Sequence, residues 1–130
     1  MKHAFLSLLA TAMITLTANA GPFGTWGYKM EIAFSGHEGG ELANFPVLVV
    51  FEDGSNGFYY SQFDSPSDGA DLRFADATDN ELYYEIEEWD DSEDKSYVWV
   101  RVPSLTDTTS IYAYWGKSDV TAPEYTTNGA

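Results

Sequence analysis

Several short stretches of this chain alternate between apolar and polar side chains, and turn-forming residues separate these stretches. In the clearest one, residues 26–34, apolar residues such as Trp26 and Phe34 alternate with others that include Lys29 and Glu31. A repeat of two residues is typical of a half-buried strand, and helical periodicity is absent. Strands recur about every 8–12 residues, which predicts an all-β fold, an antiparallel β-sandwich of the jelly-roll or immunoglobulin-like kind.

The pattern predicts about seven or eight strands. The stretch 45–51 is almost wholly apolar, which predicts a central strand covered on both faces. Pro46 stands at its start, where a missing N–H group is tolerated, and Pro103 is expected to end a later strand. The predicted strands are residues 26–34, 45–51, 58–63, 71–74, 81–89, 97–102 and 110–115.

The first twenty residues have the order of an export signal. Lys2 and His3 give a positive start, an apolar run follows over residues 4–16, and Ala18-Asn19-Ala20 is a small-residue cleavage site. The apolar run is shorter than the ~20 residues of a membrane-spanning helix, so we expect a leader that is removed before Gly21. The alternative is an uncleaved anchor. Removal predicts a protein that is secreted or held in the cell envelope, in the periplasm or on the outer surface.

The rest of the chain has the size of one domain. We expect a β-sandwich over residues 21–117 and a linker-like tail over residues 118–130, where periodicity stops and no closing strand follows. Such a tail would lead to a downstream domain. The chain has no cysteine, so packing alone, or packing with a metal, is expected to stabilise the domain.

The chain is strongly acidic. It carries 6 Lys and Arg against 21 Asp and Glu, a formal net charge of −15. Such a surface repels nucleic acid and anionic lipid, so neither partner is expected. The charge suits an extracellular, calcium-rich or salty setting, and it is equally compatible with a role in solubility alone.

The later strands carry aromatic side chains on both faces, although a sandwich strand needs only one apolar face for its core. If residues such as Tyr84 and Val98 point inward, a second set points outward, with Glu85 and Glu87 beside it. Aromatic rings next to charged groups suit the binding of a sugar. The alternatives are cover by a loop or a neighbouring domain, or an inverted assignment of the two faces. The candidate ligand-binding residues are Tyr83, Trp89, Tyr97, Trp99, Arg101, Tyr112 and Tyr114.

Aspartates crowd two neighbouring turns and form a candidate calcium site. Calcium takes about 6–8 oxygen ligands, many of them carboxylates. Aspartate is also an ordinary turn former, and Asp71 in particular fits a role in capping a turn or pairing with Arg73. The candidate ligands are Asp64, Asp68, Asp71, Asp76 and Asp79.

Enzymatic activity has little support in the sequence. Glu85, Glu87 and Asp90 stand at i, i+2 and i+5, loosely similar to the catalytic strand of concanavalin A-like glycosidases. The residue types depart from that pattern and the chain is too short for such an enzyme. After the leader, His37 is the one histidine, and no nucleophile motif accompanies it. We therefore expect no catalytic residues.

Six short blocks, taken in order and spacing, resemble the exported bacterial and archaeal family catalogued as domain of unknown function 2341. The resemblance implies an exported module that often precedes a concanavalin A-like (laminin-G-like) domain. Some family members are fused to membrane proteins resembling the proton-channel subunits of biopolymer transport. The family brings no agreed catalytic or binding residues. The blocks are residues 26–29, 44–49, 67–76, 82–89, 98–103 and 111–116.

Together these features predict an exported, non-catalytic β-sandwich module for glycan binding, surface binding or adhesion outside the cell. The alternative is a structural accessory domain of a larger envelope protein, in which the same aromatic face docks on the next domain. A glycoside hydrolase fragment is the remote alternative. The expected partners are a polysaccharide or glycan and a downstream domain, and we expect no membrane insertion of the mature domain.

Overall fold

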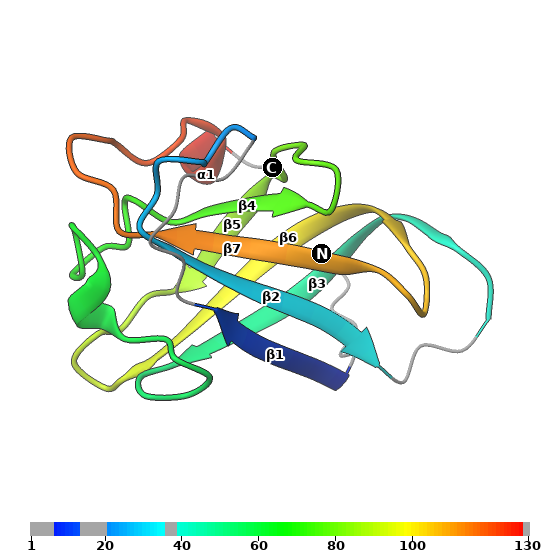
Figure 1. Ribbon diagram of the computed structural model, residues 1–130, viewed down its shortest axis with the longest axis horizontal. Coiled ribbons are helices and arrows are strands. Elements are labelled where there is room, and N and C mark those ends of the chain that lie inside the picture. The colour runs from blue at the N-terminus through cyan, green and yellow to red at the C-terminus, as the bar shows by residue number, and fades with distance from the viewer. Residues whose placement is uncertain (1–6, 14–20, 36–38, 129–130) are drawn as a thin grey trace.

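The chain forms a sandwich of two antiparallel sheets (Figure 1). The structure is a computed structural model, which describes residues 7–13, 21–35 and 39–128. The described residues contain no helix long and apolar enough to cross a membrane. The elements are β1 (Ser7–Met13), β2 (Tyr28–Ser35), β3 (Leu42–Glu52), the 3₁₀ turn η1 (Tyr60–Gln62), β4 (Arg73–Asp76), β5 (Tyr84–Glu88), β6 (Lys95–Leu105), β7 (Ser110–Trp115) and α1 (Tyr125–Asn128).

One sheet has four strands in the order β1-β2-β7-β4, and the other has three in the order β3-β6-β5. The predicted antiparallel β-sandwich is therefore confirmed, although the strands are slightly fewer than the seven or eight predicted: residues 21–128 contain six, and β1 lies before them. Consecutive strands often lie in different sheets: β2 and β3 do, and so do β6 and β7. The chain therefore crosses between the two layers repeatedly, as Greek-key sandwiches do.

The core lies between the two sheets. In β2 the alternate residues Met30, Ile32 and Phe34 point inward, and in β3 Val47 and Val49 face them. Side chains from the connections between strands complete the filling. The loop residues Phe58, Tyr60, Phe63 and Leu72 are all buried in this core.

Three strand predictions differ from the structure. Residues 58–63 form a turn and η1 instead of a strand, because Phe58, Tyr60 and Phe63 all point into the core and no period-two strand can do that. β3 is an edge strand with one face on the core, not a central one. β6 continues past Pro103, which stands opposite Asn44 at a gap in the pairing of β3 and β6.

β1 falls within the segment predicted to be an export leader. It pairs antiparallel with β2 along seven residues, from Ser7 opposite Ser35 to Met13 opposite Lys29. Residues 1–6 and 14–20 of the predicted leader lie outside the described residues. The leader itself stays a prediction.

Candidate functional site

The aromatic side chains predicted to share one outer surface lie on opposite faces of the sandwich. Tyr112 and Tyr114 flank the core residue Ala113 on β7, in the four-stranded sheet. Tyr97 and Trp99 flank the core residue Val98 on β6, in the three-stranded sheet. The expectation of one shared surface is therefore wrong, because β6 and β7 belong to different layers.

The outer face of the four-stranded sheet is covered by the segment that precedes β2. The ring of Phe23 lies 5.4 Å from the ring of Tyr114, which is buried. Trp26 packs beside Phe23 and donates from Nε1 to the carbonyl oxygen of Asp71 at 2.8 Å. Burial raises the pKa of Tyr114 to about 12. This face therefore offers little aromatic surface to a ligand.

Trp89 was predicted to point outward, and the structure turns it into the core. The pairing of β5 with β6 shifts between Ile86 and Glu88, which is a β-bulge. A bulge inserts one extra residue and reverses which side chains face inward beyond it. The ring of Trp89 lies 5.2 Å from that of Phe63, and its Nε1 donates to the carbonyl oxygen of Pro66 at 2.8 Å. Trp89 is thus a packing residue.

The remaining candidates lie on the outer face of the three-stranded sheet, which we call the β6 face. The central residues of this face are Tyr97, Trp99 and Arg101 of β6. On one side β3 places apolar residues directly opposite them, and on the other β5 places glutamates. The pairs with β3 are Val50–Tyr97, Leu48–Trp99 and Pro46–Arg101, and those with β5 are Glu88–Tyr97 and Glu85–Trp99.

Trp99 lies on the β6 face but is only 4 % exposed. Its Nε1 donates a hydrogen bond of 3.1 Å to Oε1 of Glu87, the residue at the bulge in β5. The ring is therefore held in place and presents little free surface for stacking. The sequence suggested Trp99 as a principal ligand contact, and its geometry fits a supporting role better.

Tyr83 is the most exposed aromatic side chain of the β6 face. It is 49 % exposed, and its ring stacks on that of Tyr125 with the centroids 4.4 Å apart. The backbone N–H of Arg101 donates to the carbonyl oxygen of Tyr83, which makes the two residues neighbours across the sheet. Tyr125 is fixed in turn by a 2.8 Å hydrogen bond from its hydroxyl to Oε2 of Glu81. Burial, and then the neighbouring Glu81, raise the pKa of Tyr125.

The tail predicted to be a linker packs against the sandwich instead. Nη2 of the buried Arg73 donates to the carbonyl oxygen of Thr121 at 2.7 Å. Tyr125 contacts both Tyr83 and Tyr84. These single contacts produce no periodic pattern in the sequence of the tail. The sequence therefore suggested a linker. A downstream domain stays a prediction.

The aspartate turns are held by hydrogen bonds within the protein. Asp71 is 1 % exposed, and its carboxylate accepts from the backbone N–H groups of Asp64, Ser65, Gly116 and Lys117. Buried carboxylates are tolerated when such donors surround them. The alternative in which Asp71 caps a turn is therefore confirmed.

Two other predicted calcium ligands also close their own turns. Asp68 accepts from the hydroxyl of Ser65 and the N–H of Ala70. Asp76 accepts from Thr78 and Asn80; partial burial by itself would raise its pKa, but these hydrogen bonds outweigh burial and lower it. In the part of the chain that the structure describes, no three His, Asp or Glu side chains gather as a metal site would require. The remaining two predicted ligands are Asp64 and Asp79.

Two of the three acids of the glycosidase alternative accept hydrogen bonds within the protein. Glu87 accepts from Trp99, and Asp90 accepts from the hydroxyl of Ser92 and the N–H of Glu93. The hydrogen bond from the Ser92 hydroxyl, followed by that from the Glu93 N–H, lowers the pKa of Asp90. His37 lies outside the described residues.

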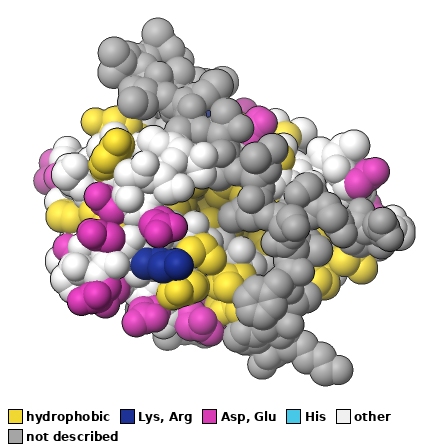
Figure 2. Space-filling model, turned by 90° about the horizontal axis from the view of Figure 1, so that it is seen from below, with side chains coloured by type: hydrophobic (Ala, Val, Ile, Leu, Met, Phe, Trp, Pro, Cys, Tyr) yellow, Lys and Arg dark blue, Asp and Glu magenta, His cyan; other side chains and the backbone are white. Residues whose placement is uncertain are grey.

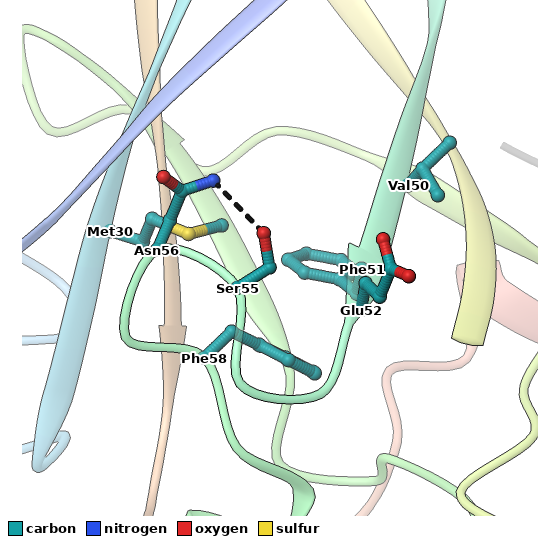
Figure 3. A pocket seen from close by; sticks show the side chains of 7 residues that line it. All are labelled: Met30, Val50, Phe51, Glu52, Ser55, Asn56 and Phe58. Atoms are coloured by element: carbon teal, nitrogen blue, oxygen red, sulfur yellow. Dashed lines mark hydrogen bonds between the residues drawn. The ribbon is translucent and has the colours of Figure 1, made fainter. Parts of the chain in front are cut away.

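Two pockets on the described surface are small or shallow. One between β2, β3 and the following turn has a volume of about 20 Å³ and is lined by Met30, Phe51 and Asn56 among others (Figure 3). That volume holds about one water molecule. A shallow hollow of about 280 Å³ is lined by residues 76–78 and 108–110. Binding sites for small molecules are usually deeper and more apolar than either of these two.

Acidic side chains dominate the exposed surface. Figure 2 shows Asp and Glu side chains spread over the described part of one face, with much less basic surface between them. Because cations there are sparse, the outward Arg101 on the β6 face is a distinctive donor.

Comparison with known proteins gives one match. Residues 68–129 match the family model described as Domain of unknown function (DUF2341). The predicted resemblance is thereby confirmed over these residues, which are just under half of the chain. They include β4 to β7 and the tail with Tyr125. No curated protein and no solved structure matches the chain.

Proposed function

We propose that this chain is an exported, non-catalytic module that binds an extracellular polysaccharide on the β6 face, around Tyr83. The observation that carries the proposal is the half-exposed ring of Tyr83, held in a stack by Tyr125 and flanked by Arg101 across the sheet. A ring already fixed in place loses little conformational entropy on binding.

The chemistry around Tyr83 suits a sugar. An aromatic ring packs against the C–H face of a pyranose, while a guanidinium donates to hydroxyl oxygens and a carboxylate accepts from hydroxyl groups. Arg101 and Glu85 supply these groups on neighbouring strands of the same face. Tyr97 extends the surface along β6, two residues from Trp99 and on the same side of the strand.

The test is retention of the processed protein, purified from a host that exports it, on insoluble polysaccharides and a glycan array. Tyr83→Ala and Arg101→Ala should each weaken retention by about tenfold, the scale of a 1.4 kcal/mol loss. Tyr59→Ala is the matched control, because Tyr59 is 44 % exposed but lies outside the β6 face. Equal retention by all three variants, or none by the parent protein, would exclude the proposal.

A protein partner is the second candidate, favoured by the apolar row of β3 beside Tyr97. Leu48 and Val50 point outward there, and Val50 is 37 % exposed. Apolar residues in a row on an exposed sheet suit a contact with a neighbouring domain. Val50→Glu should then reduce chemical cross-linking to envelope proteins while leaving polysaccharide retention unchanged.

A further inference from the structure

β2 pairs with β7 on one side and with β1, the edge strand of its sheet, on the other. In the structure β1 occupies the outer side of β2, with Leu9 opposite Ala33 and Ala10 opposite Ile32 (Figure 1). β1 lies within the predicted export leader. Removal of that leader before Gly21 would leave seven residues of β2, Lys29–Ser35, without partners on that side. An unpaired edge of this length is a template for another strand.

The other three sheet edges carry features that discourage strand addition. β4 has four residues, and one of them, Ala75, already forms a bridge with Glu81. β5 has five residues and contains the bulge and three glutamates. β3 contains Pro46, which has no N–H group, and Asn44, whose φ is 49°.

β2 has none of these features. It contains no proline, and its pairing with β7 runs without a shift from Tyr28 to Ala33. Charged side chains at an edge normally repel added strands, but the Nζ atom of Lys29 lies over the ring of Tyr112 on β7, at 4.5 Å from its centroid. Glu31 stands directly opposite Tyr112 in the pairing of β2 with β7, and its charge, after burial, raises the pKa of that tyrosine. Both charged side chains of β2 thus interact with a tyrosine of β7, the strand on the side away from this edge.

We propose that the edge of β2 over Lys29–Ser35 is a strand-accepting site, and that in the processed protein it binds an uncharged, mostly apolar strand of another polypeptide. The proposal rests on removal of the predicted leader and is independent of the β6 face. β1 shows the chemistry that this edge accepts, because its sequence SLLATAM has no charged residue. A second copy of the chain is a poor occupant, since two chains of formal charge −15 repel each other.

The test uses the processed protein from an exporting host, after mass spectrometry has located its N-terminus. A fluorescent peptide copying Ser7–Met13 should bind it and should not bind the unprocessed full chain, whose edge is occupied. Two further peptides carry N-methyl groups at alternate residues. Only every second N–H group of the peptide points toward β2, and an N-methyl group removes that donor. Only the peptide that is methylated at these residues should lose binding.

The absence of cysteine allows the register to be trapped. Ala33→Cys should form a disulfide with a peptide that has cysteine in place of Leu9, because these two residues are directly opposite. Cysteine in place of Ala10 is the matched control and should not cross-link, since Ala10 is paired with Ile32 and successive residues of a strand point to opposite faces.

Four results would overturn the proposal. They are an exported protein that retains Met1, equal peptide binding before and after processing, insensitivity to both methylation patterns, and a processed protein that sediments as a dimer cross-linked through Ala33→Cys.

Discussion

The carboxylate of Asp71 accepts a 2.8 Å hydrogen bond from the backbone N–H of Gly116, 45 residues further along the chain. The same carboxylate also accepts from the backbone N–H groups of Lys117, Asp64 and Ser65. One buried side chain therefore fixes the turn before β4 to the end of β7. Its role is structural, and it joins segments that no local sequence pattern connects.

Asp71→Ala should destabilise the fold by about 3 kcal/mol or more, because four partly buried backbone N–H groups lose a charged acceptor. Asp68→Ala is the matched control in the same turn. Asp68 is exposed and accepts from two groups only, so its loss should cost about 1 kcal/mol or less. Urea denaturation of both variants measures the difference. Equal loss of stability in the two variants would contradict the role of Asp71 in joining the turn before β4 to the end of β7.

Trp89→Ala should cost about 3–5 kcal/mol, the usual range for removing a large aromatic side chain from a core. Its ring contacts Phe51, Tyr60 and Phe63. Tyr97→Ala, on the outer face of the neighbouring strand, should cost about 1 kcal/mol or less. Comparable stability of Trp89→Ala and the parent protein would mean that Trp89 faces outward after all.

Gly69→Ala should lower the free energy of unfolding by about 2 kcal/mol or more. Gly69 has φ +66°, which costs other residues about 1–2 kcal/mol, and an added Cβ would lie 2.7 Å from the ring of Trp89. A double-mutant cycle with Trp89→Ala separates the two causes. The steric part should disappear in the double variant, and strict additivity would show that Trp89 does not crowd this position.

Stability should decline at alkaline pH. Burial raises the pKa of Tyr114 to about 12, against about 10 in an unfolded chain. A group whose folded pKa is raised contributes stability that is complete below the unfolded pKa and is lost as the pH rises through the folded pKa. The melting temperature should therefore fall between about pH 10 and 12. The melting temperature of the Tyr114→Phe variant should fall less steeply over the same range. Tyr59→Phe is the exposed control.

The sequence predicted the positions of the strands better than it predicted which strands pair in the same sheet. Alternation in β2 and β7 reflects burial on one face, which is a local property, and both strands appear close to where it indicates. Residues 58–63 have a similar apolar content, but Phe58, Tyr60 and Phe63 turn inward around η1 at a spacing that a strand cannot produce. The alternation within a strand does not show which of the two sheets it joins, because that depends on the connections before and after it.

The candidate site was predicted only in part for the same reason. Arg101, Tyr83 and Tyr97 lie on one outer face as expected, because simple alternation along β5 and β6 places them there. One bulged residue in β5 reversed the direction of Trp89, and the layer change between β6 and β7 moved Tyr112 and Tyr114 to the opposite side. A bulge adds one residue without altering the apolar pattern before it, so alternation alone could not reveal it.

The strand order also shows that the segment matched by the family model is shorter than the segment needed to complete the two sheets. The matched residues 68–129 contain β4 to β7, yet β7 lies between β4 and β2, and β6 lies between β5 and β3. A fragment cut at residue 68 would keep two incomplete sheets and lose the inward-facing side chains of β2 and β3. The smallest autonomous folding unit therefore extends well upstream of the recognisable segment, to Tyr28 at least.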